Sequence, residues 1–248
     1  MTEKIVNYEI LSNKPLTDSV FEMVLKGDTS LFMKPGQFVN LQLPNLYLRR
    51  PISVCEYDDK TITITYKVVG KGTKKLSEMR EGKINTLVGL GNGYELNITA
   101  SEVLVVGGGV GIPPLVQLCK ELRKMDKRVH VILGFNTKDE VFYEDKFKQL
   151  GCEVDVCTVD GSYGYQGMVD AVIKEKNLEH LQYFTCGPLP MMKAIYKLST
   201  SAGQLSLEER MGCGFGACMG CSIETKIGPK RVCKEGPVFT SEVLLWND

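Results

Sequence analysis

Apolar and polar residues alternate in short stretches along the first hundred residues of the chain. Residues 38–43 and 61–66 show this alternation most clearly, and it is typical of half-buried strands. Turn residues separate the stretches, for example at Lys34-Pro-Gly and Gly91-Asn-Gly. Many short strands with regular turns indicate a barrel or a sandwich over residues 1 to about 100.

The pattern changes after residue 100, where continuous apolar stretches alternate with helical ones. We expect strands at residues 103–106, 129–133, 152–158 and 183–186 and helices at residues 113–125, 139–150 and 168–175. Strands without internal alternation are typical of burial on both faces. The order of strand and helix therefore predicts an α/β unit over residues 101–204, with a parallel sheet covered by helices on both faces.

Composition narrows the class of protein. The 248 residues suit one large domain or two small ones with an appendage, and 43% of them are hydrophobic, as in ordinary globular proteins. Basic and acidic residues both total 30, so the zero formal net charge gives no general attraction to nucleic acid or membranes. No apolar run approaches the roughly 18 residues of a membrane span, and the N-terminus does not resemble a signal peptide. We expect a soluble, cytoplasmic protein.

Four of the nine cysteines follow a spacing with a specific chemistry. Cys213, Cys218 and Cys221 share one glycine-rich loop, and Cys233 follows after eleven further residues. The spacing C-x4-C-x2-C…C is the ligand pattern of a plant-type [2Fe–2S] cluster, and the glycines allow the loop to wrap around it. We expect these four thiolates to ligate a cluster that holds together residues 205–248, a segment too small for a core of its own.

Other uses of these cysteines are less consistent with the spacing. Thiolates also bind Zn²⁺, but structural zinc sites usually combine two C-x2-C pairs and this segment has one. Nine is an odd number for a disulfide framework, which would also require an oxidising compartment. The only histidines, His130 and His180, are far from the segment, which excludes a Rieske-type cluster.

Two motifs in the α/β unit point to a nucleotide. Residues 107–114, Gly-Gly-Gly-Val-Gly-Ile-Pro-Pro, lie between an expected strand and an expected helix, where glycines and a helix N-terminus can receive phosphates. The run Thr185-Cys-Gly-Pro follows the last expected strand, so Cys186 should face the same crevice. The plain alternative for residues 107–114 is a tight turn without a ligand, and the plain alternative for Cys186 is a buried cysteine before a turn.

Two motifs in the β segment have similar chemistry. Arg50 and Ser53 flank the start of an expected strand and can neutralise and hydrogen-bond a pyrophosphate. Gly70-Lys-Gly-Thr-Lys is a second glycine-rich bend that carries a hydroxyl group, and its plain alternative is a hairpin.

The order of these motifs resembles the ferredoxin–NADP⁺ reductase superfamily. Residues 207–221 and 231–239 are similar to the electron-transfer subunits of the NAD-linked, two-subunit dihydroorotate dehydrogenases (dihydroorotate dehydrogenase B), and the resemblance spans essentially the whole chain. It implies an antiparallel β-barrel that binds FAD in residues 1–100, an α/β domain that binds NAD in residues 101–204 and a [2Fe–2S] segment in residues 205–248.

The resemblance also implies roles for single residues. The residues expected to bind FAD are Arg50, Pro51, Ile52, Ser53, Lys67, Val68, Val69, Gly72 and Thr73. Those expected to frame NAD are Gly107, Gly108, Gly109, Gly111, Cys186, Gly187 and Pro188. Ile52 stands where the wider superfamily prefers tyrosine. No catalytic base for dihydroorotate is evident in this chain, and the remaining cysteines are expected to be apolar packing residues.

The implied function is electron transfer in pyrimidine biosynthesis. Electrons would pass from an FMN-containing catalytic subunit through the [2Fe–2S] cluster and FAD to NAD⁺, in a heterotetramer with two copies of each subunit. NAD is favoured over NADP because no arginine pair follows Phe135-Asn-Thr-Lys. The alternatives are the reductase subunit of another NAD(P)H-linked complex such as sulfide dehydrogenase, a stand-alone flavin monooxygenase reductase and a zinc-stabilised interaction protein.

Overall fold

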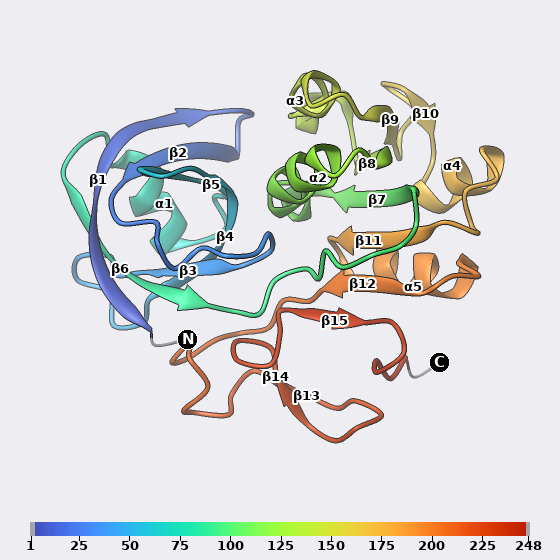
Figure 1. Ribbon diagram of the computed structural model, residues 1–248. Helices are drawn as coiled ribbons and strands as arrows, with labels where there is room; N and C mark the ends of the chain where they lie inside the picture. The colour runs from blue at the N-terminus through green and yellow to red at the C-terminus, as the bar shows by residue number, and fades with distance from the viewer. Residues whose placement is uncertain (1–2, 247–248) are drawn as a thin grey trace.

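Six antiparallel strands close into a barrel in the computed structural model, which describes residues 3–246 (Figure 1). In chain order the strands are β1 (Lys4–Pro15), β2 (Val20–Lys26), β3 (Phe38–Leu41), β4 (Arg50–Tyr57), β5 (Thr61–Lys67) and β6 (Lys83–Leu90). They are joined in the order β1-β2-β5-β4-β3-β6. Alternate side chains such as Val39, Leu41 and Ile64 fill the barrel core. The expected strands are confirmed. Because the sheet closes on itself, this half is a barrel and not a sandwich.

One helix interrupts the β pattern of this half. Helix α1 (Lys71–Glu78) follows β5 and buries Leu76 completely in the barrel core. The amide of Asn13 on β1 donates a 2.9 Å hydrogen bond to the Leu76 carbonyl and ties the helix to the barrel. The glycine-rich bend therefore begins a helix, and the hairpin alternative is wrong. A helix of two turns with six polar or charged residues shows too little apolar periodicity to be seen in the sequence.

A seven-stranded sheet forms the second half of the fold. Its strands are β7 (Glu102–Gly108), β8 (Arg128–Phe135), β9 (Glu153–Thr158), β10 (Tyr165–Gln166), β11 (Gln182–Cys186), β12 (Gly203–Ser206) and β15 (Val238–Thr240). They lie in the order β10-β9-β8-β7-β11-β12-β15, and every neighbouring pair is parallel except β12–β15. The predicted parallel sheet is confirmed, with one antiparallel strand added at its edge.

Helices cover both faces of this sheet (Figure 1). Helices α2 (Pro114–Lys124) and α3 (Glu144–Gln149) share one apolar cluster with the sheet, and α4 (Val169–Glu175) and α5 (Leu189–Leu198) share the other. Two 3-10 turns, η1 (Gly109–Gly111) and η2 (Lys138–Glu140), follow β7 and β8. The helix expected over residues 139–150 is broken, because Tyr143 has a φ of +67° and α3 starts only after it.

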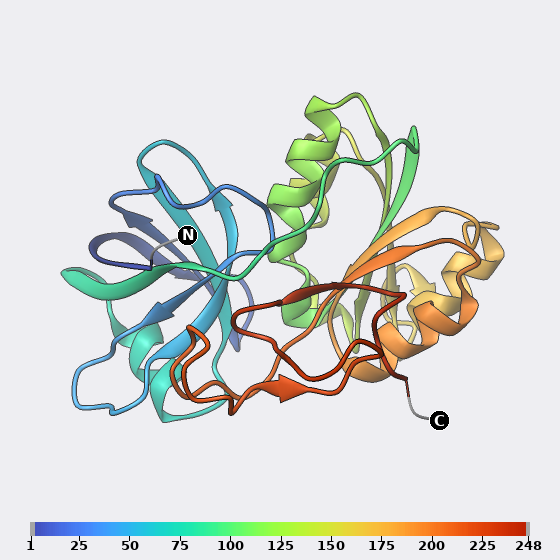
Figure 2. The ribbon, with the colours of Figure 1, turned by 60° about the horizontal axis from the view of Figure 1, so that its bottom comes forward.

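The C-terminal segment runs along both halves (Figures 1 and 2). It contains a small hairpin of β13 (Ser222–Ile223) and β14 (Lys230–Arg231) before it reaches β15. Cys221 and Cys233 belong to the same apolar cluster as Phe38 of the barrel and Val106 of the sheet. The segment therefore takes its core from both neighbours. None of the helices within residues 3–246 has the length and apolar composition needed to cross a membrane.

Candidate functional site

A cavity of about 510 Å³ lies between the barrel and the carboxyl ends of the sheet strands. This is the edge at which open α/β sheets bind ligands. The cavity brings together predicted site residues from distant parts of the sequence, namely Ser53, Lys67, Gly108, Gly109, Gly111, Cys186, Gly187 and Pro188. Two of the residues expected to bind FAD, Ser53 and Lys67, therefore share one crevice with most of those expected to frame NAD.

The turns after β7 and β11 are packed directly against each other. A Cβ atom at Gly111 would stand 2.4 Å from the Cys186 carbonyl oxygen, so only glycine fits at this position. A Cβ at Gly109 would meet no atom within 4 Å, which shows open space beside the turn. Helix α2 starts at Pro114, immediately beyond. A glycine turn with open space before a helix N-terminus fits the pyrophosphate of a dinucleotide.

Several residues of the cavity wall were not identified from the sequence: Asn136, Glu140, Phe142, Asp170, Ser206 and Glu208. Glu140 accepts hydrogen bonds from the backbone N–H and the amide of Asn136, at 3.1 and 2.7 Å, and lies 3.6 Å from the Lys67 ammonium group of the barrel. Burial acts to raise the pKa of Glu140, but the Asn136 donors and Lys67 outweigh it and lower that pKa. Asn136, Ser206 and Glu208 lie at or just after strand carboxyl ends, so the strand-end rule could have found them.

The remaining predicted flavin residues lie farther along the barrel. Arg50 is packed against Gly72, where an added Cβ would stand 2.2 Å from Arg50 Nε. Since α1 begins at Lys71, the guanidinium lies beside backbone N–H groups that have no partner within the helix. This combination fits a second pyrophosphate. The Thr73 hydroxyl accepts hydrogen bonds from the N–H groups of Val69 and Gly70, so it shapes the turn.

Eight predicted residues lie outside the cavity lining: Arg50, Pro51, Ile52, Val68, Val69, Gly72, Thr73 and Gly107. Ile52 and Val68 pack against the barrel core, and Gly107 is buried within β7. Val69 is 80% exposed although it lies two residues from Lys67.

The four predicted cluster cysteines lie in two pairs. The sulfur atoms of Cys221 and Cys233 are 3.2 Å apart, and the Cys213 thiol hydrogen-bonds with that of Cys218. A [2Fe–2S] cluster has two irons with two protein ligands each, so two pairs of thiols fit it. The described residues contain no group of three or more His, Cys, Asp or Glu side chains arranged around one metal ion.

Backbone N–H groups point at these sulfur atoms. Ala217 and Cys218 donate to Cys213 Sγ at 3.2 and 3.4 Å, and Cys233 donates to Cys221 Sγ at 3.4 Å. Desolvation acts to raise the pKa of Cys213, but the backbone donors outweigh it and lower that pKa to about 6. Burial and the Cys221 thiol raise the pKa of Cys233 to about 12. N–H donors to sulfur also stabilise bound clusters, so this donor set fits the predicted ligands.

All nine cysteines are free, so the disulfide alternative is wrong. Cys55, Cys119, Cys152 and Cys157 are buried, as expected for packing residues.

Comparison with known proteins agrees with this geometry. The family described as the iron–sulfur cluster binding domain of dihydroorotate dehydrogenase B matches residues 208–245. The oxidoreductase NAD-binding domain family matches residues 105–197. These two matches cover the cluster cysteines and the cavity turns, respectively.

One curated relative, the dihydroorotate dehydrogenase B (NAD(+)) electron transfer subunit of Fusobacterium nucleatum, is 42% identical over 95% of this chain and 96% of its own length. The solved NADH-dependent reduced ferredoxin–NADP oxidoreductase superimposes with a TM-score of 0.87 at 30% identity, covering 96% of this chain and 90% of that chain. A ferredoxin NADP⁺ reductase from Neisseria gonorrhoeae, solved with FAD and NADP, shares the fold at a TM-score of 0.66 and 20% identity, covering 79% of this chain and 90% of that one. The chain belongs to the family of dihydroorotate dehydrogenase B electron transfer subunits.

Proposed function

We propose that this chain carries electrons from a dihydroorotate-oxidising subunit to NAD⁺ in pyrimidine biosynthesis. One observation supports this most strongly: a single part of the barrel adjoins both candidate redox sites. Ser53 of β4 lines the nucleotide cavity, and Asn40 of the neighbouring strand β3 hydrogen-bonds to the carbonyl of the cluster cysteine Cys213. Strands β3 and β4 therefore lie between the nucleotide cavity and the loop that carries Cys213.

We assign three cofactor sites to the chain. FAD is assigned to the barrel, from Arg50 and Gly72 to Ser53 and Lys67, and NAD to the cavity beside it. The [2Fe–2S] cluster is assigned to the four paired cysteines. When bound, FAD exchanges a hydride with NAD and single electrons with the cluster, which connects two-electron and one-electron chemistry.

The residues of the chain bind and orient these groups. Arg50 supplies a fixed positive charge beside the first turn of α1, where an anionic pyrophosphate is neutralised. Gly111 and Cys186, which are packed against each other, line the NAD cavity, and Glu140 contacts Lys67 and Asn136 at its wall. No residue is assigned as a catalytic acid or base for dihydroorotate.

The names of the relatives imply a separate catalytic subunit. We propose that this partner contains FMN, binds dihydroorotate and assembles with this chain as a heterotetramer with two copies of each. A cytoplasmic location is proposed because nine free thiols and an iron–sulfur cluster suit a reducing compartment. The shared name of the relatives does not favour another NAD(P)H-linked complex such as sulfide dehydrogenase.

A division into an FAD domain (1–100), an NAD domain (101–204) and a cluster segment (205–248) is also proposed. It is supported by the gap between the last barrel strand, which ends at Leu90, and the first sheet strand, which begins at Glu102. Strand β15 of the proposed cluster segment pairs with β12, which begins at Gly203 in the proposed NAD domain.

The test is an activity assay of the purified chain loaded with FAD and the cluster. We expect NADH to reduce an artificial dye, and we expect no dye reduction with dihydroorotate. Addition of the FMN-containing catalytic subunit should create dihydroorotate-dependent reduction of NAD⁺. Oxidation of dihydroorotate by this chain alone would contradict the proposed division of labour.

A further inference from the structure

Strand β3 of the barrel contains one polar side chain in a buried row of four residues. Val39 and Leu41 point into the barrel core. Phe38 points the other way and packs in the apolar cluster that contains Cys221 and Cys233. Since side chains alternate along a strand, Asn40 shares the outward face with Phe38, and it is 1% exposed. A buried amide therefore faces the C-terminal segment.

The Asn40 amide contacts the loop that carries the first cluster cysteine. Its Nδ2 donates a 3.3 Å hydrogen bond to the Cys213 carbonyl oxygen. The next residue, Gly214, has a φ of +78°, and an added Cβ there would stand 2.4 Å from Asn40 Nδ2. Gly214 is thus required both for the turn of the loop and for its close approach to Asn40.

The backbone of Asn40 is tied to the predicted flavin strand. Asn40 lies opposite Pro51 of β4 in the antiparallel ladder. Its carbonyl oxygen accepts a 3.1 Å hydrogen bond from the guanidinium of Arg49, which also bonds to Asn85 of β6. One residue therefore contacts the flavin strand through its backbone and the cluster loop through its side chain.

Burial of the Asn40 amide at this position costs free energy of folding. Asn40 Oδ1 is buried and has no hydrogen-bond partner among the described residues. Leaving a buried acceptor unpaired destabilises a fold, and an apolar side chain would avoid that loss. The contact with the Cys213 carbonyl is the interaction that an apolar side chain could not provide.

We propose that Asn40 is a positioning residue that holds the cluster loop against barrel strands β3 and β4. It thereby fixes the environment of the cluster and the distance between the cluster and the flavin. The inference rests on the proposed function, because it needs the cluster at the four cysteines. Asn40 acts through the carbonyl and backbone of Cys213, and it is not assigned as a ligand.

The test compares the holoprotein with its Asn40→Ala variant by electron paramagnetic resonance and by rapid-mixing kinetics. We expect flavin reduction by NADH to stay within about twofold, while cluster content or the rate of cluster reduction falls by about 10- to 100-fold, as for residues that support metal ligands. The resonance of the cluster that remains should change its g-values. The matched control is Asn85→Ala, which removes a barrel amide that contacts Arg49 and Asn7. It should leave the cluster signal unchanged.

A second variant tests the same contact from the loop side. Gly214→Ala leaves the barrel sequence intact and should reproduce the cluster defect of Asn40→Ala, even if that variant folds poorly. The double variant should be no worse than the more severe single one, because both disturb one contact. A normal cluster signal and normal cluster reduction in either single variant would overturn the inference. Absence of the signal in the unmodified protein would instead refute the cluster assignment itself.

Discussion

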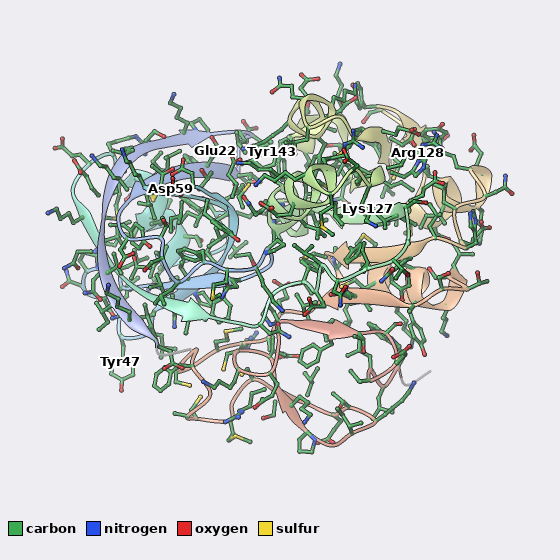
Figure 3. All side chains as sticks on the ribbon, in the orientation of Figure 1. Glu22, Tyr47, Asp59, Lys127, Arg128 and Tyr143 are labelled. Atoms are coloured by element: carbon green, nitrogen blue, oxygen red, sulfur yellow. The ribbon has the colours of Figure 1, made fainter. Side chains whose placement is uncertain are left out.

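Tyr143 of the sheet domain reaches across to Glu22 of the barrel, and its hydroxyl donates a 2.5 Å hydrogen bond to Glu22 Oε2 (Figure 3). The same hydroxyl lies 2.7 Å from Thr65 Oγ1. Lys146 lies over the Tyr143 ring at 4.7 Å and bonds to Glu56 of the barrel at 2.5 Å. This polar contact joins the two walls of the nucleotide cavity, since Phe142 of the same segment lines that cavity.

Tyr143→Phe should loosen this junction. The change leaves the ring in place but removes the hydroxyl group that hydrogen-bonds to Glu22 and Thr65. Loss of a hydrogen bond to a charged group costs about 1.5–3 kcal/mol. We expect a lower free energy of unfolding in urea and a higher KM for NADH. The matched control is Tyr47→Phe, because Tyr47 is 98% exposed and should tolerate the change. Equal loss of stability in both variants would contradict the role of the Tyr143 hydroxyl.

Gly111→Ala should damage nucleotide binding without affecting the cluster. The added Cβ would collide with the Cys186 carbonyl, so the two turns of the cavity must separate. A displacement of binding groups by about 1 Å lowers kcat/KM by about 10- to 100-fold, and we expect a loss of this size. Steady-state kinetics with NADH and a dye measure the effect. Iron and acid-labile sulfide should remain at the level of the unmodified protein, and parallel loss of both would show a general folding defect.

Cysteine reactivity in the cluster-free chain should follow the local pKa values. A lowered thiol pKa means more thiolate at a given pH, so Cys213, with a pKa of about 6, should react with iodoacetamide at pH 7. Burial raises the pKa of Cys186 to about 12, so that thiol should stay unlabelled. Labelling of Cys213 should fall as the pH is lowered through 6. Mass spectrometry of the labelled peptides measures the relative reactivity of the cysteines. Equal labelling of Cys213 and Cys186 would contradict the prediction.

Cys218→Ser should remove the cluster and leave the flavin. Cys218 is exposed on the loop and pairs with Cys213, so replacing its sulfur leaves one iron with a single cysteine ligand instead of two. We expect FAD content and NADH-dependent flavin bleaching to persist while the cluster absorbance disappears. Cys152→Ser, which changes a cysteine outside the cluster loop, is the control and should retain both chromophores.

The sequence was sufficient for features that depend on local pattern. The barrel strands β3 and β5 and the sheet strands β7, β8, β9 and β11 follow from the pattern of apolar residues. Ligand spacing identified the four cysteines, and the structure adds that Cys221 and Cys233 lie close together. The break at Tyr143 was not predictable, because a hydrogen bond to a strand about 120 residues away stabilises its left-handed backbone.

Tertiary contacts also explain the missed site residues. Glu140 lines the cavity and pairs with Lys67, which lies at the end of barrel strand β5, far away in the sequence. Asn40 reads in the sequence as one polar position in a strand, and its contact with Cys213 spans 173 residues. The pairing of β15 with β12 likewise depends on the path of the C-terminal segment, which runs along both halves and comes to the front in Figure 2.

The most direct test of the account is electron paramagnetic resonance of the anaerobically purified, flavin-loaded protein before and after addition of NADH. We predict a silent spectrum before addition and the signal of a reduced [2Fe–2S] cluster after it, together with bleaching of the flavin. Flavin bleaching with no cluster signal, in protein that contains no iron or acid-labile sulfide, would contradict electron transfer through these four cysteines.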